Sequence, residues 1–150
     1  FVIVMPHWGA EYIHTPGSSQ KYSAKLMVDV GADLIIGGHA HVVQGIQEID
    51  GVPIVYSLGN FVFDQEIPQT WNAVTAGVIL DGDSVTIQLM PVYTRYGQPT
   101  PLNDAESQDV LKIIADASDE DLQQQILNGK IKQITYLNTN QLNIILFGYN

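Results

Sequence analysis

Apolar residues near the start of the chain form two short runs, at 1–4 and 33–36, each of a length typical of a buried strand. Between them, residues 18–30 can form a helix that Ser18 or Ser19 caps and Gly31 ends. Its apolar positions fall on one face: Tyr22, Leu26, Met27 and Val30. The pattern predicts a strand, a helix and a second strand, the order of a parallel α/β unit.

Later segments carry the signals of antiparallel hairpins. Three pairs of strand-like segments flank turn-forming residues: 44–49 with 53–56, 76–80 with 85–90, and 130–136 with 142–147. The fold class predicted from the whole pattern is therefore mixed α/β, in which parallel units give way to antiparallel sheet.

Residues 95–103 contain two prolines and a glycine and are interpreted as a connecting loop at a subdomain boundary. After it, Asn103 and Glu106 have the spacing of a capping box. They precede a helix with an apolar face, and a second helix is expected at 118–129. We therefore expect two parts. Residues 1–101 form the first, and residues 102–150 pack on it as two helices and a terminal hairpin.

Composition excludes several functions. Sixteen acidic residues against six basic ones give a net charge of −10, which repels nucleic acid and anionic membrane surfaces. The chain has no cysteine, so a disulfide, a thiolate metal site and a cysteine nucleophile are all excluded. No apolar run reaches the length of a membrane span.

Three of the four histidines follow the two apolar strands. His7 comes after the first strand, and His39 and His41 follow Gly37-Gly38 after the second. Ligands in α/β proteins gather at strand ends, and imidazoles without thiolates favour Mn, Fe or Zn. We therefore predict that the three side chains bind metal. The alternative is ordinary structural or surface histidines.

Other polar and aromatic residues near these strand ends are candidates for the same cleft. Glu11 is placed to act on protons or orient a ligand, and otherwise is a solvated loop glutamate. Asn60 is a polar contact in the cleft or a turn residue, and Trp8 is a cleft-wall or core aromatic. His14 is interpreted as an exposed loop residue.

Three blocks of sequence carry a resemblance to a known family. They are residues 7–12 (HWGAEY), 31–44 (GADLIIGGHAHVVQ) and 56–65 (YSLGNFVFDQ), with Pro16 and Gln20 between the first two. In this order they resemble the CapA family of bacterial poly-gamma-glutamate capsule proteins, over residues 1 to about 101.

That family is similar to the calcineurin-like metallophosphoesterases, whose four-layer fold binds two metal ions at strand ends. The resemblance implies that His7 is the isolated histidine ligand and that His39 and His41 are the pair of the Gly-His-x-His motif. The family's upstream aspartate and asparagine or histidine motifs are absent from these residues. The chain is therefore expected to be a C-terminal fragment with an incomplete two-metal site, inactive alone.

The resemblance also sets expectations for the intact protein. It implies a metal-dependent phosphoesterase-like hydrolase in capsule biosynthesis, or alternatively a non-catalytic accessory component of the synthesis and export machinery. The expected partners are the anionic capsule polymer or a phosphoester substrate, together with other capsule-synthesis proteins. The expected location is extracytoplasmic, with a membrane anchor in a segment outside these residues.

Overall fold

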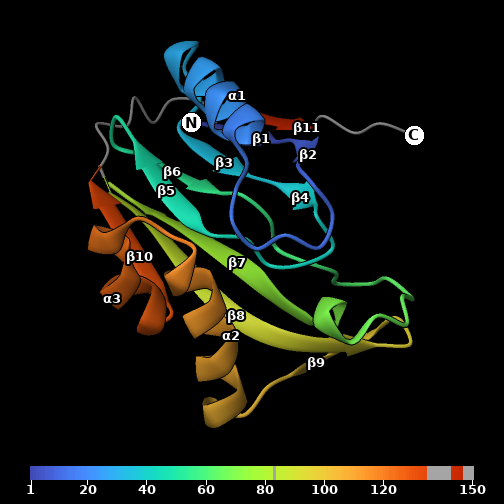
Figure 1. The fold of residues 1–150 in the computed structure, drawn as a ribbon. Helices are drawn as coiled ribbons and strands as arrows, with labels where there is room; N and C mark the ends of the chain where they lie inside the picture. Colours follow the sequence, from blue (N-terminus) through green and yellow to red (C-terminus); the bar gives the residue numbers. More distant parts are fainter. Residues whose placement is uncertain (83, 135–142, 147–150) are drawn as a thin grey trace.

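The computed structural model describes residues 1–82, 84–134 and 143–146. Within these residues it has a mixed α/β architecture with three α-helices, a five-stranded sheet, an antiparallel sheet of four strands and a two-stranded ladder (Figure 1). No helix in the described part of the chain is long and apolar enough to cross a membrane. The predicted fold class is confirmed at this level.

The first sheet is mostly parallel. Its order is β11 (Asn143–Leu146), β1 (Val2–Met5), β3 (Leu34–Ile36), β6 (Val52–Val55) and β5 (Ile46–Ile49). The pairs β1 with β11, β1 with β3 and β3 with β6 are parallel, whereas β5 returns antiparallel to β6.

The central strands of this sheet bury side chains on both faces, as parallel strands do. On one face Leu34, Ile36 and Val55 join a large core shared with the second sheet. On the other face Ile35 and Ile54 join a smaller core under α1 (Ser18–Asp29). The sheet therefore lies between α1 and the second sheet, as Figure 1 shows.

The predicted packing face of α1 is wrong at three of its four positions, whereas the fourth, Met27, packs against the smaller core. Tyr22, Leu26 and Val30 are 68%, 48% and 86% exposed, whereas Gln20 and Ala24 are buried. The Gln20 amide is satisfied in the interior, since its oxygen accepts from the Gly17 N–H and its Nε2 donates to Gln44 at 2.8 Å. The helix thus approaches the sheet on a side with a small residue and a paired polar one.

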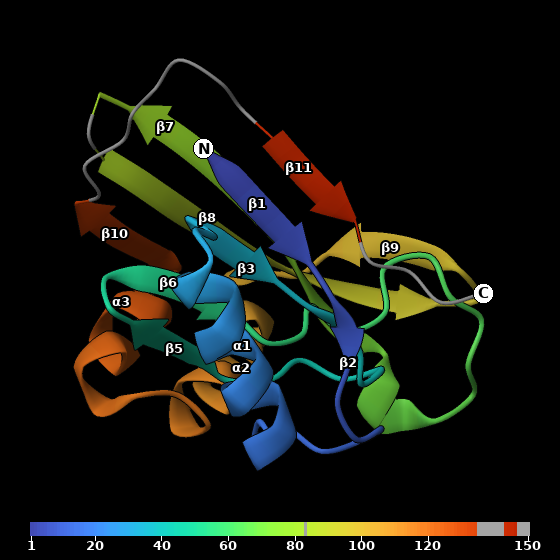
Figure 2. The same cartoon turned by 90° about the horizontal axis from the view of Figure 1, so that it is seen from above.

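The second sheet is antiparallel and lies beneath the first (Figure 2). It comprises β10 (Lys130–Ile134), β8 (Ser84–Arg95), β7 (Asn72–Asp81) and β9 (Gln98–Pro101), in which β8 pairs with all three others. The expectation of a loop at 95–103 is wrong over β9, which forms a hairpin with β8. Its two prolines are tolerated because β9 is an edge strand and needs no second ladder.

Two of the three predicted hairpins are confirmed. β5 and β6 turn at Asp50-Gly51, both with positive φ, and β7 and β8 pair out to Asp81 and Ser84. The third is wrong, because β10 pairs antiparallel with β8 while β11 pairs parallel with β1 in the other sheet. The residues expected to form its turn, between 136 and 142, lie outside the described residues.

Two further helices close the side of the core. α2 (Asp104–Asp116) has the predicted cap: the Asn103 side chain accepts from the Glu106 N–H at 3.0 Å, and the Glu106 carboxylate accepts from the Asn103 N–H at 3.2 Å. A 3₁₀ turn, η2 (Glu120–Leu122), leads into α3 (Gln123–Leu127). Buried side chains of α2 and α3 belong to the large core, so that core spans both predicted parts, 1–101 and 102–150.

The turn after α2 also binds the free edge of β5. Ile46 donates its N–H to the Ser118 hydroxyl at 2.7 Å and accepts from the Asp119 N–H at 3.2 Å. Glu48 donates its N–H to the Asp119 carboxylate at 3.2 Å. The unpaired edge of the first sheet is thereby covered by backbone and side chains from the second part of the chain.

Gly45 packs directly against the backbone of Ala117 in the second part, so a substitution there tests this packing. A Cβ at position 45 would lie 1.9 Å from the carbonyl oxygen of Ala117. Gly45→Ala should therefore lower the free energy of unfolding by about 2–3 kcal/mol, because a backbone oxygen must move. Gly77→Ala is the control, since its Cβ would meet only ordinary contacts from 3.6 Å. Equal urea midpoints for the two variants would contradict this packing.

Candidate metal centre

One parallel ladder brings the two histidine segments together. β1 pairs with β3 as Ile3 with Leu34, and beyond Pro6 the short strands β2 (His7–Trp8) and β4 (Gly38–His39) pair with the same offset of 31 residues. The Gly38 N–H donates to the Pro6 carbonyl at 3.0 Å and holds the two segments together across the break. The predicted meeting of the two strand ends is confirmed.

Gly37 and Trp8 pack against Tyr56 beneath this ladder. The Trp8 indole N–H donates to the Tyr56 carbonyl at 2.9 Å, and the two rings stack with centroids 5.6 Å apart. A Cβ at Gly37 would lie 2.2 Å from that carbonyl oxygen and 2.4 Å from the indole nitrogen. Only glycine fits there, and Trp8 serves as packing beneath the site.

His39 leaves the regular strand geometry and turns toward His7. Trp8 and His39 are register partners, so an ordinary strand would place both on the side away from His7. His39 has φ of +92°, and its Nδ1 lies 2.9 Å from Nε2 of His7, with ring centroids 4.5 Å apart. The unusual backbone is what allows the two imidazoles to meet.

His41 is held by a chain of amide hydrogen bonds. Its Nδ1 lies 2.9 Å from Oδ1 of Asn60, which is buried. Asn60 Nδ2 donates to Gln65 Oε1 at 3.1 Å, and Gln65 Nε2 donates to the Tyr12 hydroxyl at 2.7 Å. Because an amide oxygen only accepts, the proton of His41 is on Nδ1 and the lone pair of Nε2 is left for another partner.

Aromatic rings enclose His41. Tyr12 stacks on it at a centroid distance of 6.0 Å, and Phe63 lies 4.9 Å away. The His39 ring is 6.1 Å from that of His41. The three histidines therefore form one continuous group rather than two separate sites.

Backbone strain is concentrated at this group. In the described part of the chain five non-glycine residues have positive φ, and Tyr12, His39 and His41 are three of them. Such conformations cost on the order of 1–3 kcal/mol each and persist where the surroundings impose them, often at functional sites. Here the Tyr12 N–H donates to the Ala40 carbonyl at 2.8 Å and joins the strained loops.

The environment favours a neutral His7. Partial burial lowers the pKa of His7, and the neighbouring positive charges of His39 and His41 lower it further. Neutral imidazole is the form that donates a lone pair to a metal ion.

The other residues predicted for the site have different surroundings. Glu11 lies on an exposed turn after β2, and no hydrogen bond joins it to the histidines in the described part of the chain. Asn60, predicted as a cleft contact, is the direct partner of His41. His14 is half-buried rather than exposed, with Nδ1 2.7 Å from the Val43 carbonyl. The sequence does not predict Tyr12 and Gln65 as site residues, because no spacing rule links residues 12, 60 and 65.

The donor set fits part of a metal site. His39 Nδ1 and His7 Nε2 are 2.9 Å apart, a hydrogen-bond distance. Two nitrogen ligands of one tetrahedral ion, with bonds of about 2.0–2.1 Å, lie about 3.3–3.4 Å apart, so a small separation of the two rings would place both nitrogens on one ion. The bond from His41 to Asn60 is of the kind that orients metal-binding histidines. However, the described residues contain no group of three or more His, Asp or Glu side chains arranged to hold an ion.

Comparisons with known proteins match this region of the chain. The chain is 40% identical over 105 residues to the capsule biosynthesis protein CapA of Bacillus anthracis. It is 37% identical over 102 residues to the PGA biosynthesis protein CapA of Bacillus subtilis (strain 168). Residues 1–65 match the family model described as bacterial capsule synthesis protein PGA_cap. Over these matched residues the chain belongs to this family. The matched residues contain all three histidines, Tyr12, Asn60 and Gln65.

The coverage of these matches is unequal. The two CapA alignments cover 69% and 67% of this chain but 26% and 27% of the relatives, so the chain spans about a quarter of their length. An uncharacterized protein of Sinorhizobium fredii, y4sH, is 34% identical to the chain over 58 residues. This alignment covers 39% of the chain and 13% of the length of y4sH. The chain is thus a homologue of CapA-type poly-gamma-glutamate capsule biosynthesis proteins over part of their length.

The role of Asn60 in orienting His41 can be tested by NMR. Asn60→Ala should let the His41 ring exchange between its two neutral tautomers, because the acceptor at Nδ1 is lost. Two-bond ¹H–¹⁵N spectra of the rings should then show averaged nitrogen shifts for His41. His14 is the internal control, since the Val43 carbonyl holds its proton on Nδ1 in both proteins. An unchanged His41 pattern would contradict the assignment.

Proposed function

We propose that the chain is part of a metal-dependent hydrolase that acts on a phosphoester during capsule biosynthesis, with His7, His39 and His41 as metal ligands. The observation that carries the proposal is the convergence of the three imidazoles at the ends of β2 and β4, with His7 and His39 nitrogens 2.9 Å apart. The family membership supports the capsule context.

The chemistry proposed for the bound ions is activation of water and polarisation of the phosphoryl oxygen. Mn, Fe and Zn suit a ligand set of imidazoles without thiolates. The residues of the chain itself hold and orient the ligands: Asn60 fixes the His41 tautomer, and the ladder below Trp8 places His7 opposite His39.

The proposal includes a finer fold assignment, to the calcineurin-like metallophosphoesterase architecture of layered sheets with metals at strand ends. Two features support it: the histidines follow β1 and β3 of the parallel sheet, and a second sheet packs against it. The two-metal site and a position outside the cytoplasmic membrane belong to the same proposal. A capsule lies outside the cell, which agrees with the latter.

Metal binding by the histidines can be measured on the chain by calorimetric titration with Zn²⁺. Removing a residue that only orients a metal ligand typically lowers metal affinity by about 10–100-fold. His39 is proposed as a ligand itself, so His39→Ala should weaken Zn²⁺ binding by at least about tenfold. His14→Ala is the matched control and should bind as the unchanged protein does, because its ring faces Val43. Equal affinities of the His39 and His14 variants would end the metal assignment.

A non-catalytic accessory role is the second candidate, and one observation favours it: no carboxylate joins the histidines in a group able to hold an ion, within the described residues.

The catalytic and the accessory role predict different effects of the histidines on the amount of capsule. If the protein is a hydrolase, His39→Ala in the intact protein should reduce both phosphoester hydrolysis and capsule per cell, the former by at least about 100-fold because several kcal/mol of charge stabilisation are lost. If it is an accessory protein, capsule should persist in a variant lacking all three histidines and disappear only when the protein is deleted.

A further inference from the structure

The single arginine of the chain, Arg95, is held between two aromatic rings at the end of β8. Its guanidinium carbon lies 4.6 Å from the centroid of the Trp71 ring and 4.8 Å from that of Tyr96. Among the side chains that the structure describes, none forms an ion pair with it. Both rings lie against the guanidinium, and no hydrogen bond joins its N–H groups to a described residue, so these groups remain for another partner.

The surroundings of Arg95 are fixed by hydrogen bonds. The Trp71 indole N–H donates to the Gln65 carbonyl at 2.8 Å, and the Trp71 carbonyl accepts from the Thr94 N–H. The Thr94 hydroxyl donates to the Phe61 carbonyl at 3.0 Å. Tyr96 has φ of +53° in the tight turn between β8 and β9, a costly conformation for an aromatic residue. The two rings are therefore positioned by backbone contacts from separate segments.

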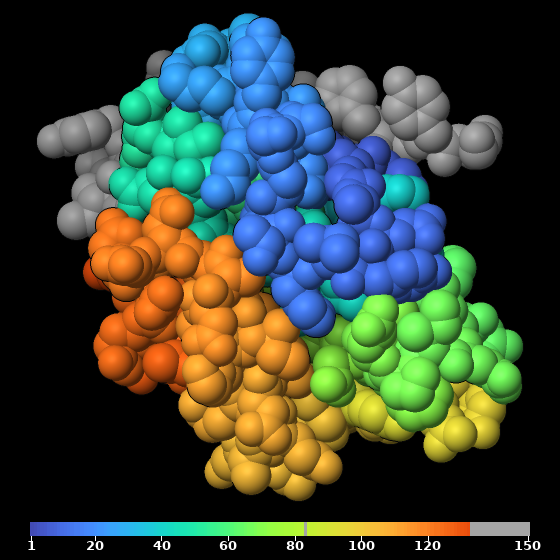
Figure 3. Space-filling view, viewed as in Figure 1, coloured from blue at the N-terminus to red at the C-terminus, as the bar shows by residue number. Residues whose placement is uncertain are grey.

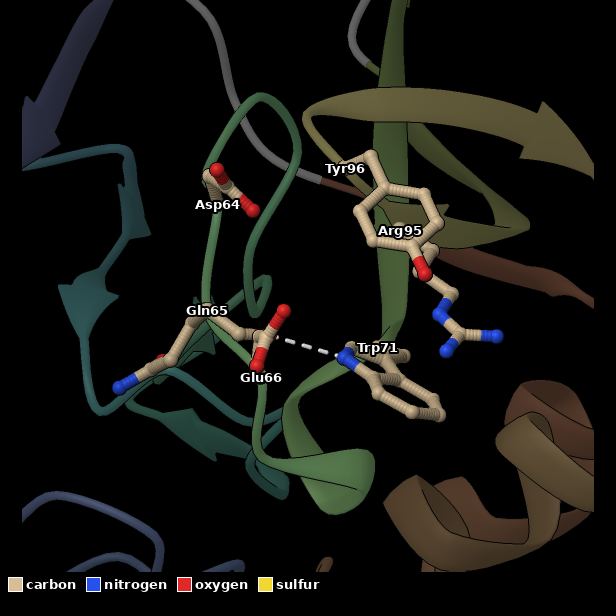
Figure 4. A pocket seen from close by; sticks show the side chains of 6 residues that line it. All are labelled: Asp64, Gln65, Glu66, Trp71, Arg95 and Tyr96. Atoms are coloured by element: carbon tan, nitrogen blue, oxygen red, sulfur yellow. Dashed lines mark hydrogen bonds between the residues drawn. The ribbon is translucent and has the colours of Figure 1, made fainter.

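Arg95 lines a pocket of about 160 Å³ with acidic residues on the opposite side. The pocket residues are Asp64, Gln65, Glu66, Trp71, Arg95 and Tyr96, shown in Figure 4. Asp64 and Glu66 come from the loop after β6, whereas Arg95 and Tyr96 come from the β8–β9 hairpin. Since neither carboxylate reaches Arg95 as an ion pair, charges of both signs face the same space without neutralising each other.

This arrangement selects a particular ligand chemistry. A guanidinium edge pairs with a planar carboxylate, while the two carboxylates accept from N–H donors. Aromatic walls suit methylene groups. A bare phosphate can pair only with Arg95 and offers the two carboxylates no N–H donor, whereas a group that carries an acid and N–H donors together can pair with all three.

We propose that this pocket binds an amino-acid unit, with its carboxylate at Arg95 and its ammonium or amide N–H groups at Asp64 and Glu66. A glutamyl unit has these groups and a methylene chain between them, so it matches the pocket in chemistry and size. This inference rests on the proposed function only where it links binding in the pocket to catalysis at the metal centre.

Gln65 connects the pocket to the histidine group. Its carbonyl accepts from Trp71 in the pocket wall, while its side chain is directed away from Arg95 and bonds to Asn60 and Tyr12 (Figure 4). Figure 3 shows the segment around 61–71, in green, between the first loop, in blue, and the hairpin, in yellow. A unit bound at Arg95 would thus lie next to the candidate metal centre.

The test is an NMR titration with the dipeptide γ-glutamyl-glutamate in buffer with EDTA, so its outcome does not depend on metal binding. Because the chain has one arginine, a single Nε–Hε resonance reports on the site. We expect saturable shifts of this resonance and of the Trp71 indole. The Trp8 indole, bonded to the Tyr56 carbonyl, should not move and confirms that the protein stays folded.

Variants and competing probes make the test decisive. Arg95→Gln, followed through the Trp71 indole, should weaken binding by about tenfold or more, because a charge-assisted hydrogen bond is lost. Lys21→Gln removes the same charge from an exposed site on α1 and should change nothing. Glutarate, which lacks the amino group, and inorganic phosphate should each bind more weakly than the dipeptide.

The proposal is overturned if the dipeptide causes no saturable shift, or if Arg95→Gln and Lys21→Gln bind it equally. Equal binding of glutarate would remove the role of Asp64 and Glu66, and equal binding of phosphate would make the pocket a general anion site. Either result also overturns it. A positive titration with failed Zn²⁺ binding would leave the pocket standing and reject the metal centre alone.

Discussion

The pairing of β1 with β3, continued without a change of register into β2 and β4, is the constraint on which the site depends. A one-residue slip in a strand sends every side chain to the opposite face. β3 is buried on both faces, so the interior resists such a slip: one face packs under α1 and the other against the second sheet. The energy that holds His7 opposite His39 therefore comes from the apolar cores rather than from the histidines.

The second element of the site is the segment after β6, which joins the two sheets. Asn60 and Gln65 lie on it and reach the histidine loops, while the Phe61 and Gln65 carbonyls accept from Thr94 and Trp71. The isolated pairing of Val43 with Leu58 anchors its start. Thus an otherwise irregular segment has polar groups bonded both to the histidine loops and to Thr94 of the second sheet, which is what allows it to orient His41.

Local patterns predicted much of this structure and failed where contacts are distant. Hydrophobic runs, glycine turns and the Asn103 cap depend on neighbours in sequence, and the elements they predicted are present. The α1 packing face failed because a buried glutamine was stabilised by Gln44, a partner 24 residues away. The last hairpin failed because β10 and β11 have partners in different sheets. The histidines were found from strand ends, whereas Tyr12 and Gln65 are linked to them only through the folded amide chain.

Gln65 uses its backbone and its side chain for different neighbours. The carbonyl supports Trp71, and any residue at this position would supply it, whereas the side-chain amide accepts from Asn60 and donates to Tyr12 and so must reach both. A glutamate could accept from both Asn60 and the Tyr12 hydroxyl but would add a negative charge beside them, and a shorter asparagine would not span the same gap. The position thus has a narrow chemical tolerance despite lying in an irregular segment, where sequence usually drifts most freely.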